Sequence, residues 1–458
     1  IPCYRVEVKD STFTENRFFS IQNLKTYQGF LVLSTDLSVT NTEFAGNIWS
    51  NFEIFADALH TSNILLSGNS FNQEIFYQTK LINANPSEDF DNGYGSTLRY
   101  RTVLLEKSSF QGIQFFDQSQ LIQSQAPFLI MTGNIFRDFT FTNSSFVIIK
   151  GVSQVCAGST TRNSTVEQNV YKNYPQVITS FSIAFTNYCN GSCYFSMIAN
   201  NTFSSSSMTN AMNSYFDLLS FTPQEIGYST FIITNNIVKE LESDFGLFRI
   251  PSTEGGAIVH NNVIVDSSLS YTICLGDVAW VSLENNSLVG LHGVSSVIYV
   301  DPFNSKLSIA NTVIANSRFN QTFMQVEVES CSYIKVNTIT VANSIIYVGG
   351  IPDLFNGIML SITNQTTTAT ISLENVRLNV SFASFIVPKS GYYDIPLSAF
   401  VFAKLQGLGQ VILQNIVLGI VNQKAAAFQL LAAYGEHISF DRLEFNPHKI
   451  SSLSTDFI

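Results

Sequence analysis

Two groups of acidic residues have the spacing that a catalytic pair or a cation site would need. Glu240, Glu242 and Asp244 alternate along one segment, and Glu327 alternates with Glu329 in another. Carboxylates two residues apart on an extended strand lie ~6.5–7 Å apart at Cα, which suits an inverting glycosidase pair or a bound cation. The same alternation is typical of the solvated outer face of a strand. We favour that second interpretation and expect no catalytic residues here.

A short acidic segment resembles the start of a calcium-binding loop. Asp89 and Asp91 stand at alternate positions before Gly93, as at the start of a calcium-binding loop. The bidentate Glu that should follow is missing, so a plain polar turn is the favoured interpretation, with Asp89 and Asp91 as weak metal candidates. We therefore expect no metal and no cofactor. Trp49 and Trp280 are too few for a sugar-binding platform, and we expect both in the core or at coil corners.

The six cysteines favour structural disulfides over a metal site. No His lies near the local pair, and no second pair has finger spacing. Oxidised pairs imply a secretory route. The connectivity stays open among Cys3, Cys156, Cys189, Cys193, Cys274 and Cys331, of which Cys189 and Cys193 form the local pair.

N-glycosylation sequons support the same location. About this many would arise by chance in so Asn-rich a chain, but together with the cysteines and the low charge they favour a secreted or cell-surface glycoprotein. The candidates are Asn143, Asn163, Asn190, Asn200, Asn285, Asn320, Asn364 and Asn379.

The composition limits the partners. Only 12% of the 458 residues are charged, against roughly 25% in ordinary soluble proteins. A net charge of −11 without clustered Lys or Arg excludes nucleic acid as a partner. No uninterrupted apolar run approaches the ~20 residues of a membrane-spanning helix. Hydrophobic residues make up 45% of the chain, which is enough to build a large core.

A repeated phrase predicts the architecture that must position these residues. Apolar residues alternate, Asn-rich positions follow, and another apolar residue comes three places later; Val6–Phe13 and Leu37–Phe44 are examples. Between 238 and 314 the spacing of the final residue is 26, 24 and 26 residues. Period-2 alternation in a unit of this length predicts one coil of a β-helix. The markers are Phe13, Phe44, Phe71, Phe110, Phe136, Tyr171, Phe203, Val238, Ile264, Leu288, Ile314, Ile339, Leu378, Leu418 and Phe445.

The markers predict an all-β, right-handed parallel β-helix of about fifteen coils, with 1–458 as a single solenoid. Asn tolerates the left-handed conformation at a bend and can hydrogen-bond along the axis, so the paired Asn positions are expected at turns. Longer intervals are expected to form insertion loops. These cover about 77–100, 150–165, 204–225, 344–368 and 385–405.

The whole chain resembles the right-handed parallel β-helix, or pectin-lyase-like, superfamily. Phe-X-X-Asn at Phe13–Asn16 and Phe44–Asn47, and Gly255-Gly256-Ala257-Ile258, are also similar to repeats of surface-displayed β-helix adhesins. The resemblance implies the fold, and it implies that cleavage of acidic polysaccharides must be considered. Pectinase-type elements are missing: there is no Asp-Asp pair and no Arg-X-Lys, and His292 stands in Leu-His-Gly.

The two ends of the repeat suggest a function. The phrase begins at Val6 and ends at Phe445, which leaves little sequence for caps. We expect either a fragment of a longer solenoid or end-to-end stacking, because open strand edges template further pairing. The leading hypothesis is an extracellular, non-enzymatic structural glycoprotein, a subunit of a filament or surface fibre that associates with itself end to end. The alternatives are a carbohydrate-active enzyme and a non-catalytic carbohydrate-binding rod with a carbohydrate or cell-surface partner.

Overall fold

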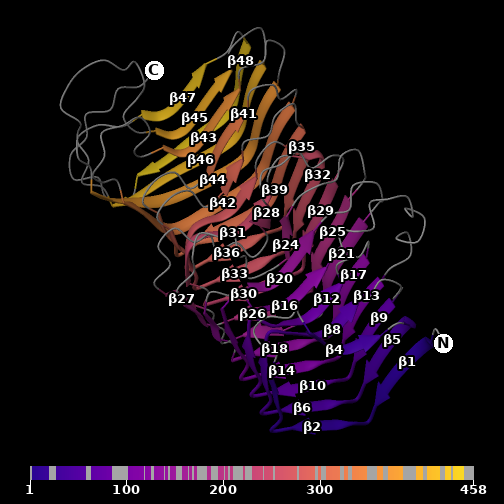
Figure 1. Ribbon diagram of the computed structural model, residues 1–458. Coiled ribbons are helices and arrows are strands. Elements are labelled where there is room, and N and C mark those ends of the chain that lie inside the picture. Colours follow the sequence, from indigo (N-terminus) through magenta and orange to yellow (C-terminus); the bar gives the residue numbers. More distant parts are fainter. Residues whose placement is uncertain are drawn as a thin grey trace. The chain divides into compact units, whose positions relative to one another are not determined.

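The fold is taken from a computed structural model, in which the described residues fall into two compact units, Ile1–Ile237 (unit 1) and Val238–Ile458 (unit 2). Each unit is treated separately. Every regular element in the described ranges is a β-strand, and no helix occurs there (Figure 1). It follows that these ranges contain no apolar helix long enough to cross a membrane. The described residues are 3–19, 27–32, 34–57, 63–84, 102–117, 119–124, 128–138, 140–142, 145–150, 157–162, 165–167, 170–172, 183–186, 194–200, 202–204, 207–209, 220–221, 229–240, 242–250, 253–275, 278–293, 298–300, 306–319, 324–328, 333–347, 358–364, 370–384, 399–405, 410–422, 429–434 and 437–447.

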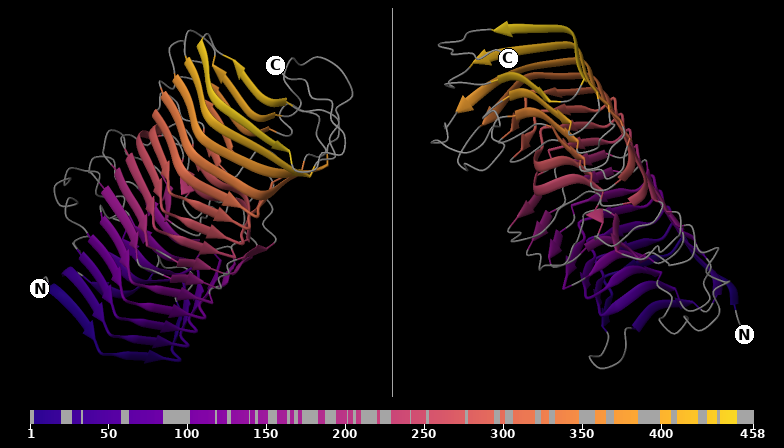
Figure 2. Two further views of the ribbon diagram at one scale, coloured as in Figure 1. Left: turned by 180° about the vertical axis from the view of Figure 1, so that it is seen from behind. Right: turned by 90° about the horizontal axis from the view of Figure 1, so that it is seen from above.

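Unit 1 is a parallel β-solenoid, in which each strand pairs with its counterpart in the next turn (Figure 2). The first column contains β1 (Cys3–Lys9), β5 (Ser34–Thr40), β9 (Asn63–Ser67), β13 (Thr102–Glu106), β17 (Phe128–Thr132), β21 (Ala157–Arg162), β25 (Tyr194–Ala199) and β29 (Ser229–Thr234). The second contains β2 (Thr12–Thr14), β6 (Glu43–Ala45), β10 (Ser70–Asn72), β14 (Ser109–Gln111), β18 (Ile135–Arg137), β22 (Thr165–Glu167) and β26 (Thr202–Ser204). The third contains β3 (Arg17–Phe19), β7 (Ile48–Ser50), β11 (Ile75–Tyr77), β15 (Gln114–Phe116), β19 (Thr140–Thr142), β23 (Val170–Lys172) and β27 (Ser207–Thr209).

A separate second sheet closes the turns of unit 1. Its seven strands in the described ranges are β4 (Tyr27–Val32), β8 (Phe52–Asp57), β12 (Lys80–Ala84), β16 (Gln120–Ser124), β20 (Ser145–Lys150), β24 (Ile183–Thr186) and β28 (Ser220–Phe221). This sheet gives about seven turns, so the predicted count of about fifteen coils is not matched.

Unit 2 is also a parallel solenoid. One set of paired strands is β32 (Thr253–His260), β35 (Val278–Glu284), β39 (Lys306–Ala315), β42 (Tyr333–Tyr347), β44 (Thr370–Ser384), β46 (Gln410–Asn422) and β48 (His437–Pro447). The other is β31 (Glu242–Ile250), β34 (Ser268–Leu275), β38 (Ile298–Val300), β41 (Met324–Val328), β43 (Ile358–Asn364), β45 (Ala399–Leu405) and β47 (Gln429–Tyr434). Short strands complete the turns: β30 (Ile237–Lys239), β33 (Val263–Val265), β36 (Ser287–Val289), β37 (His292–Gly293) and β40 (Arg318–Phe319).

Paired asparagines form the bends, as predicted, but the two members of a pair do different things. The first residue takes the left-handed conformation, with φ of 56° at Asn261 and 54° at Asn285. The second is buried, and Asn262 donates from its backbone N and its Nδ2 to Oδ1 of Asn286, each at 3.1 Å. Asn286 Nδ2 in turn donates to the carbonyl of Val259 at 2.8 Å. We call such a chain of buried side chains, one from each turn, a turn ladder.

The core of unit 1 contains a stack of phenylalanines, one from each turn. Phe44 and Phe71 lie 4.6 Å apart between ring centroids at an interplanar angle of 2°, and Phe71 and Phe110 lie 4.7 Å apart at 3°. These distances are the ~4.8 Å spacing of neighbouring strands, so the register forces the rings into face-to-face contact. Phe13 and Phe136 extend the stack at 5.1 Å on either side.

The register corrects two of the marker residues. Phe136 pairs with Val166, so Val166 and not Tyr171 occupies the marker position of that turn, and Tyr171 pairs with Phe141 in the third column. In unit 2 Ile314 pairs with Val341, whereas Ile339 pairs with Thr312. The five predicted insertions contain both described strands and residues outside the described ranges. The single-solenoid assignment and these loops stay predictions.

Candidate functional site

The side chains with the most chemical potential lie on one surface of unit 2, which we call the outer face. It consists of the outward-pointing residues of β32, β35, β39, β42 and β44. Alternation produces it, because Val281 and Leu283 of β35 are buried and the residues between them point outward. The register aligns these residues in three rows. The rows are Trp280, Lys306, Tyr333 and Thr370; then Ser282, Ser308, Lys335 and Ser372; then His260, Glu284, Ala310, Asn337 and Glu374.

A His–Ser–Glu group on the outer face resembles a nucleophilic site in composition only. His260 Nε2 lies 2.8 Å from Ser282 Oγ, and Ser282 Oγ donates to Glu284 Oε1 at 2.8 Å. A serine hydroxyl has one proton, and a nucleophilic serine must give it to the histidine. Here that proton lies on the glutamate side, which leaves the serine oxygen as the acceptor for His260. The geometry therefore cross-links β32 and β35 and does not activate Ser282.

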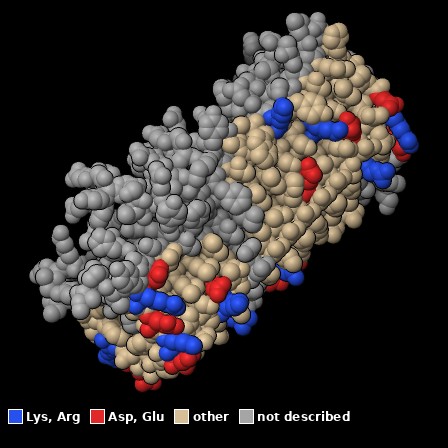
Figure 3. All heavy atoms as spheres, turned by 90° about the vertical axis from the view of Figure 1, so that its right-hand side faces the viewer, with Lys and Arg blue, Asp and Glu red and all other residues tan. Residues whose placement is uncertain are grey.

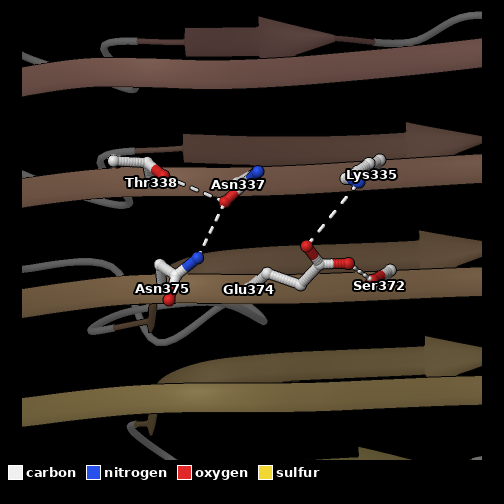
Figure 4. A network of polar contacts seen from close by, with 6 residues as sticks. All are labelled: Lys335, Asn337, Thr338, Ser372, Glu374 and Asn375. Carbon is white, nitrogen blue, oxygen red and sulfur yellow. Dashed lines mark hydrogen bonds and ion pairs between the residues drawn. The ribbon is translucent and has the colours of Figure 1, made fainter.

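A second polar group lies two strands further along (Figure 4). Lys335 Nζ lies 3.6 Å from Glu374 Oε2, and Ser372 Oγ donates to Glu374 Oε1 at 2.8 Å. Beside this ion pair, Asn375 Nδ2 donates to Asn337 Oδ1 at 3.1 Å, and Thr338 Oγ1 donates to the same oxygen at 2.9 Å. The ion pair is about one-third exposed and neutral overall, so it holds the strands in register and contributes little net stability.

Trp280 has a different environment from the one the sequence predicted. Its side chain is 38% exposed on the outer face, whereas Trp49 is 1% exposed in the core of unit 1. The expectation that both lie in the core or at a corner is therefore wrong for Trp280. A Cβ built on Gly256 would lie 1.8 Å from Cε2, 2.0 Å from Cζ2 and 2.4 Å from Cδ2 of Trp280. Only a glycine leaves room for this ring, which is why the indole can lie on β32.

In unit 1 the notable group is a buried carboxyl within a turn ladder. Glu74 is fully buried, and its Oε1 accepts hydrogen bonds from the backbone N of Asn47 at 3.2 Å and from Asn47 Nδ2 at 2.9 Å. Its Oε2 accepts a 2.6 Å hydrogen bond from Trp49 Nε1. Burial raises the pKa of Glu74 to about 7, while these donors from Trp49 and Asn47 act in the opposite direction.

Sequence reasoning missed Glu74, although a signal was present. Phe13 and Phe44 are each followed three residues later by an asparagine, and at the same distance after Phe71 stands Glu74. An acidic residue at a position that is otherwise amide-bearing and buried is a candidate for an unusual environment. The His260–Ser282–Glu284 group was missed because its members are 22 and 2 residues apart and only the register joins them.

The predicted carboxylate groups are not brought together in the expected way. Glu240 has φ of 51° and is therefore at a turn, not on an extended strand with Glu242. Glu242 and Asp244 lie in β31, where the pairing with β34 shifts between Ser243 and Gly246. Glu327 lies in β41 and pairs with Thr363. Glu329 lies outside the described residues.

Only some of the metal, disulfide and glycosylation candidates lie within the described residues. Within the described ranges no group of three or more His, Cys, Asp or Glu residues could hold a metal ion. Asp89 and Asp91 lie outside them, as do Cys156, Cys189, Cys193 and Cys331. Cys3 lies in β1 and Cys274 in β34. The disulfides stay a prediction.

Two of the sequons occur in an accessible turn. Asn200 and Asn285 are exposed at left-handed bends with φ of 54° each. Asn364 is the last residue of β43, and Asn379 lies within β44. Asn143, Asn163, Asn190 and Asn320 lie outside the described residues. Glycosylation therefore stays a prediction.

Charges on the protein surface are mixed. On the face presented in Figure 3, Lys and Arg side chains stand among Asp and Glu side chains, with uncharged residues between them. Ion pairs such as Arg5 with Glu7 (3.6 Å) and Arg442 with Glu444 (3.5 Å) join neighbours on the same strand. This arrangement agrees with the low charged fraction of the sequence.

Comparison with known proteins gives one structural neighbour. No family model and no curated protein matches the chain. A solved structure described as a PL6 alginate lyase in complex with a trisaccharide is 11% identical, covers 90% of this chain and 85% of its own, and has a TM-score of 0.25. At that TM-score the likeness supports no conclusion about this chain. The fold assignment rests on the strand pairing, which confirms the parallel β-solenoid that the sequence predicted.

Proposed function

We propose that this chain is an extracellular structural β-solenoid that forms part of a filament or surface fibre by stacking end to end. The observation that carries the proposal is the use of polar side chains. In the turns of both units, buried amides and hydroxyls bond to the turn above or below, as Asn262 does to Asn286 and Asn69 does to the carbonyl of Val39. On the outer face Ser282 and Glu374 are likewise engaged between strands or with their own neighbours. These polar groups therefore serve to hold neighbouring turns and strands together.

Exposed apolar side chains on β48 support the end-to-end form. Ile438, Phe440 and Leu443 are 38%, 57% and 46% exposed, although the equivalent residues Val411, Leu413 and Ile416 of β46 are buried. Among the described strands β48 pairs with β46 alone. Adding a parallel strand from another solenoid would cover these side chains and satisfy the backbone groups of the strand edge.

Electron microscopy of the purified protein tests the proposal. Negative staining should show elongated assemblies whose length grows with protein concentration. Phe440→Glu places a charge among the stacking side chains and should abolish the assemblies. Ser439→Glu, on the same strand but outward-facing, is the matched control and should leave them intact. Single particles at all concentrations, or equal behaviour of the two variants, would contradict end-to-end stacking through β48.

A carbohydrate-active enzyme is the second candidate. The observation that favours it is the presence of His260, Lys335, Glu284 and Glu374 on one outer face, since these types can act as acids and bases. Cleavage of uronate polysaccharides, assayed with and without calcium, tests it. Activity that is lost in Glu284→Gln and Glu374→Gln would make this candidate the better one.

A further inference from the structure

We propose that β48 of one copy pairs in parallel with β1 of the next copy, in the register that places Arg442 opposite Asp10. This inference rests on the proposed end-to-end stacking and deepens it, because it names both surfaces of the contact and the residues that select its register. Three observations carry it: the matching bends of the two edges, their incompletely buried apolar side chains and their complementary charges.

The bends at the two edges fix the alignment of the strands. Asp10 and Asn41 have φ of 49° and 48°, and Asn41 Nδ2 donates to Asp10 Oδ1 at 3.3 Å. At the other edge Asn415 and Arg442 have φ of 51° and 60°, and the strand pairing on either side places them opposite each other. At both edges, therefore, a left-handed bend stacks on a left-handed bend. Continued across two copies, this rule places Arg442 opposite Asp10.

The inward-facing side chains match when the bends are aligned. Ile438 then lies opposite Val6, and Phe440 lies opposite Val8. Val6 and Val8 are half-buried, although the residues that pair with them in β5 are fully buried. Each edge therefore exposes apolar side chains that the other edge covers, and the contact removes apolar surface from water on both copies.

Leu443 is the exposed apolar residue whose counterpart is polar, because Ser11 lies opposite it. Unit 2 already contains such a combination: Thr312 pairs with Ile339, and both are buried. Thr312 donates its hydroxyl proton to the carbonyl two residues before it, at 3.2 Å. Ser11 makes the same hydrogen bond at 2.9 Å. The Ser11 hydroxyl therefore keeps its acceptor when Leu443 covers it.

The charges beside the two bends are complementary in the same alignment. Arg442 lies opposite Asp10, Asp441 lies opposite Lys9, and all four side chains are exposed. Residues opposite each other on neighbouring strands are about 4.5–5.5 Å apart at Cβ, which is within reach of an ion pair. A guanidinium group only donates hydrogen bonds and a carboxylate accepts them, so Arg442 and Asp10 also match as donor and acceptor. Complementary charges of this kind fix the register of an interface.

The charges disfavour the symmetrical alternative, in which two copies pair through β48 alone. Aligning the two bends would then place Arg442 opposite Arg442 of the other copy, and like charges directly opposite each other are destabilising. At the equivalent bend of the preceding described turns of unit 2 the residues are uncharged. They are Asn261, Asn285, Asn311, Thr338, Asn375 and Asn415.

Exchanging the order of the two charges at one edge tests the register without changing the net charge. One variant combines Asp441→Arg with Arg442→Asp, and the other combines Lys9→Asp with Asp10→Lys. Each variant alone places like charges opposite each other at both positions of the contact. Lys107 already occupies a left-handed bend with φ of 49°, so the fold accepts a lysine there. Thermal melts show whether each variant is folded.

Sedimentation velocity over a concentration series gives the concentration at which half of the protein is assembled. For each variant alone this concentration should rise at least about tenfold. An equimolar mixture of the two variants should assemble as the wild type does, because every contact between unlike variants restores both pairs of opposite charges. A head-to-tail contact predicts this rescue, and a contact of β48 with itself does not.

Two controls make similar changes outside the proposed ion pairs. Lys239→Glu combined with Glu240→Lys exchanges two exposed charges at another bend of unit 2 and should assemble as the wild type does. Ser439→Glu should also leave assembly intact. Ser439 lies opposite Glu7, and Arg5 lies 3.6 Å from Glu7, so the added charge meets a pair that is neutral overall.

The outcomes separate this inference from the proposed function. A wild-type protein that does not assemble at any concentration would overturn both. Assembly of the wild type together with unchanged assembly of both folded variants, or without rescue in the mixture, would overturn the register and leave end-to-end stacking in place.

A second pair of variants covers the case in which an exchange variant does not fold. Asn is the common residue at these bends, so Arg442→Asn and Asp10→Asn retain the backbone geometry. Each should raise the half-assembly concentration about threefold, because it removes one pair of opposite charges. Half-assembly concentrations equal to that of the wild type would overturn the register.

Discussion

Glu74 occupies the ladder position that Asn47 holds in the preceding turn, and it accepts two hydrogen bonds from that asparagine, at 3.2 Å and 2.9 Å. Asn16 bonds to Asn47 in the same manner, with its backbone N at 2.9 Å and its Nδ2 at 3.0 Å from Asn47 Oδ1. An amide can continue this hydrogen-bond pattern to the next turn, because it both donates and accepts hydrogen bonds. An ionised carboxyl can only accept hydrogen bonds, and it places a charge in the buried ladder.

The stability of unit 1 should depend on the ionisation of Glu74. Its folded-state pKa of about 7 is above the ordinary value of 4.5, so the neutral form is favoured in the folded state. The associated stability is fully present below pH 4.5 and is lost as the pH rises through 7, by on the order of 3 kcal/mol. Thermal melts between pH 5 and 8 should show a falling midpoint. Glu74→Gln should flatten this profile, and exposed Glu43→Gln should not. Parallel profiles for all three proteins would refute this role.

The phenylalanine stack should be the most sensitive part of the core. Phe71→Ala removes a ring that is 1% exposed and contacts Phe44 and Phe110 on both faces. The expected loss is about 3–5 kcal/mol of unfolding free energy, measured by denaturant titration. Phe19→Ala is the control, since Phe19 is 61% exposed and its removal should change stability by less than about 0.5 kcal/mol. Similar losses of unfolding free energy for both variants would contradict a special contribution of the stack to stability.

The two members of an asparagine pair should differ in their response to substitution. Asn286→Ala leaves the backbone N of Asn262 and the carbonyl of Val259 without their buried partner, at a cost of about 2–4 kcal/mol. Asn285→Ala affects only a left-handed turn residue and should cost about 1 kcal/mol. Asn285→Gly should be close to neutral. Urea titrations of the three variants provide the comparison, and a larger loss for Asn285→Ala than for Asn286→Ala would contradict the ladder.

Asn285 should carry a glycan when the chain passes through a eukaryotic secretory pathway. Its side chain is exposed at a bend, and Ser287 stands two residues later. Mass spectrometry before and after enzymatic deglycosylation should show a modified peptide that contains Asn285, and Asn285→Gln should remove it. An unmodified Asn285 in secreted protein would exclude the site.

The architecture could be predicted because the residues that stack in successive turns recur in the same order along the sequence. Alternating apolar residues and Asn pairs appear in order along the chain, so the parallel solenoid and the bends at Asn261 and Asn285 could be read without coordinates. The marker residue of the turn that contains Val166 was predicted wrongly. Tyr171 is the more conspicuous apolar residue in the sequence, but strand pairing and not residue size decides which side chain takes the marker position.

The candidate sites could not be predicted because they depend on contacts between turns. Trp280 was expected in the core or at a coil corner, and only the absence of a side chain at Gly256 lets the indole lie outside. Neither residue alone indicates this arrangement. Likewise, burial raises the pKa of Glu74, and the hydrogen bond from Trp49 on the neighbouring turn opposes that rise. A linear reading of the sequence does not place Trp49 beside Glu74.

Sedimentation velocity of the wild-type protein over a wide concentration range tests the central claim most directly. End-to-end stacking predicts a sedimentation coefficient that rises with concentration and frictional ratios that rise with it, because each added copy lengthens the particle. Phe440→Glu should remain a single slow species under the same conditions. A wild-type protein that sediments as one monomeric species at every concentration would contradict the proposed structural assembly.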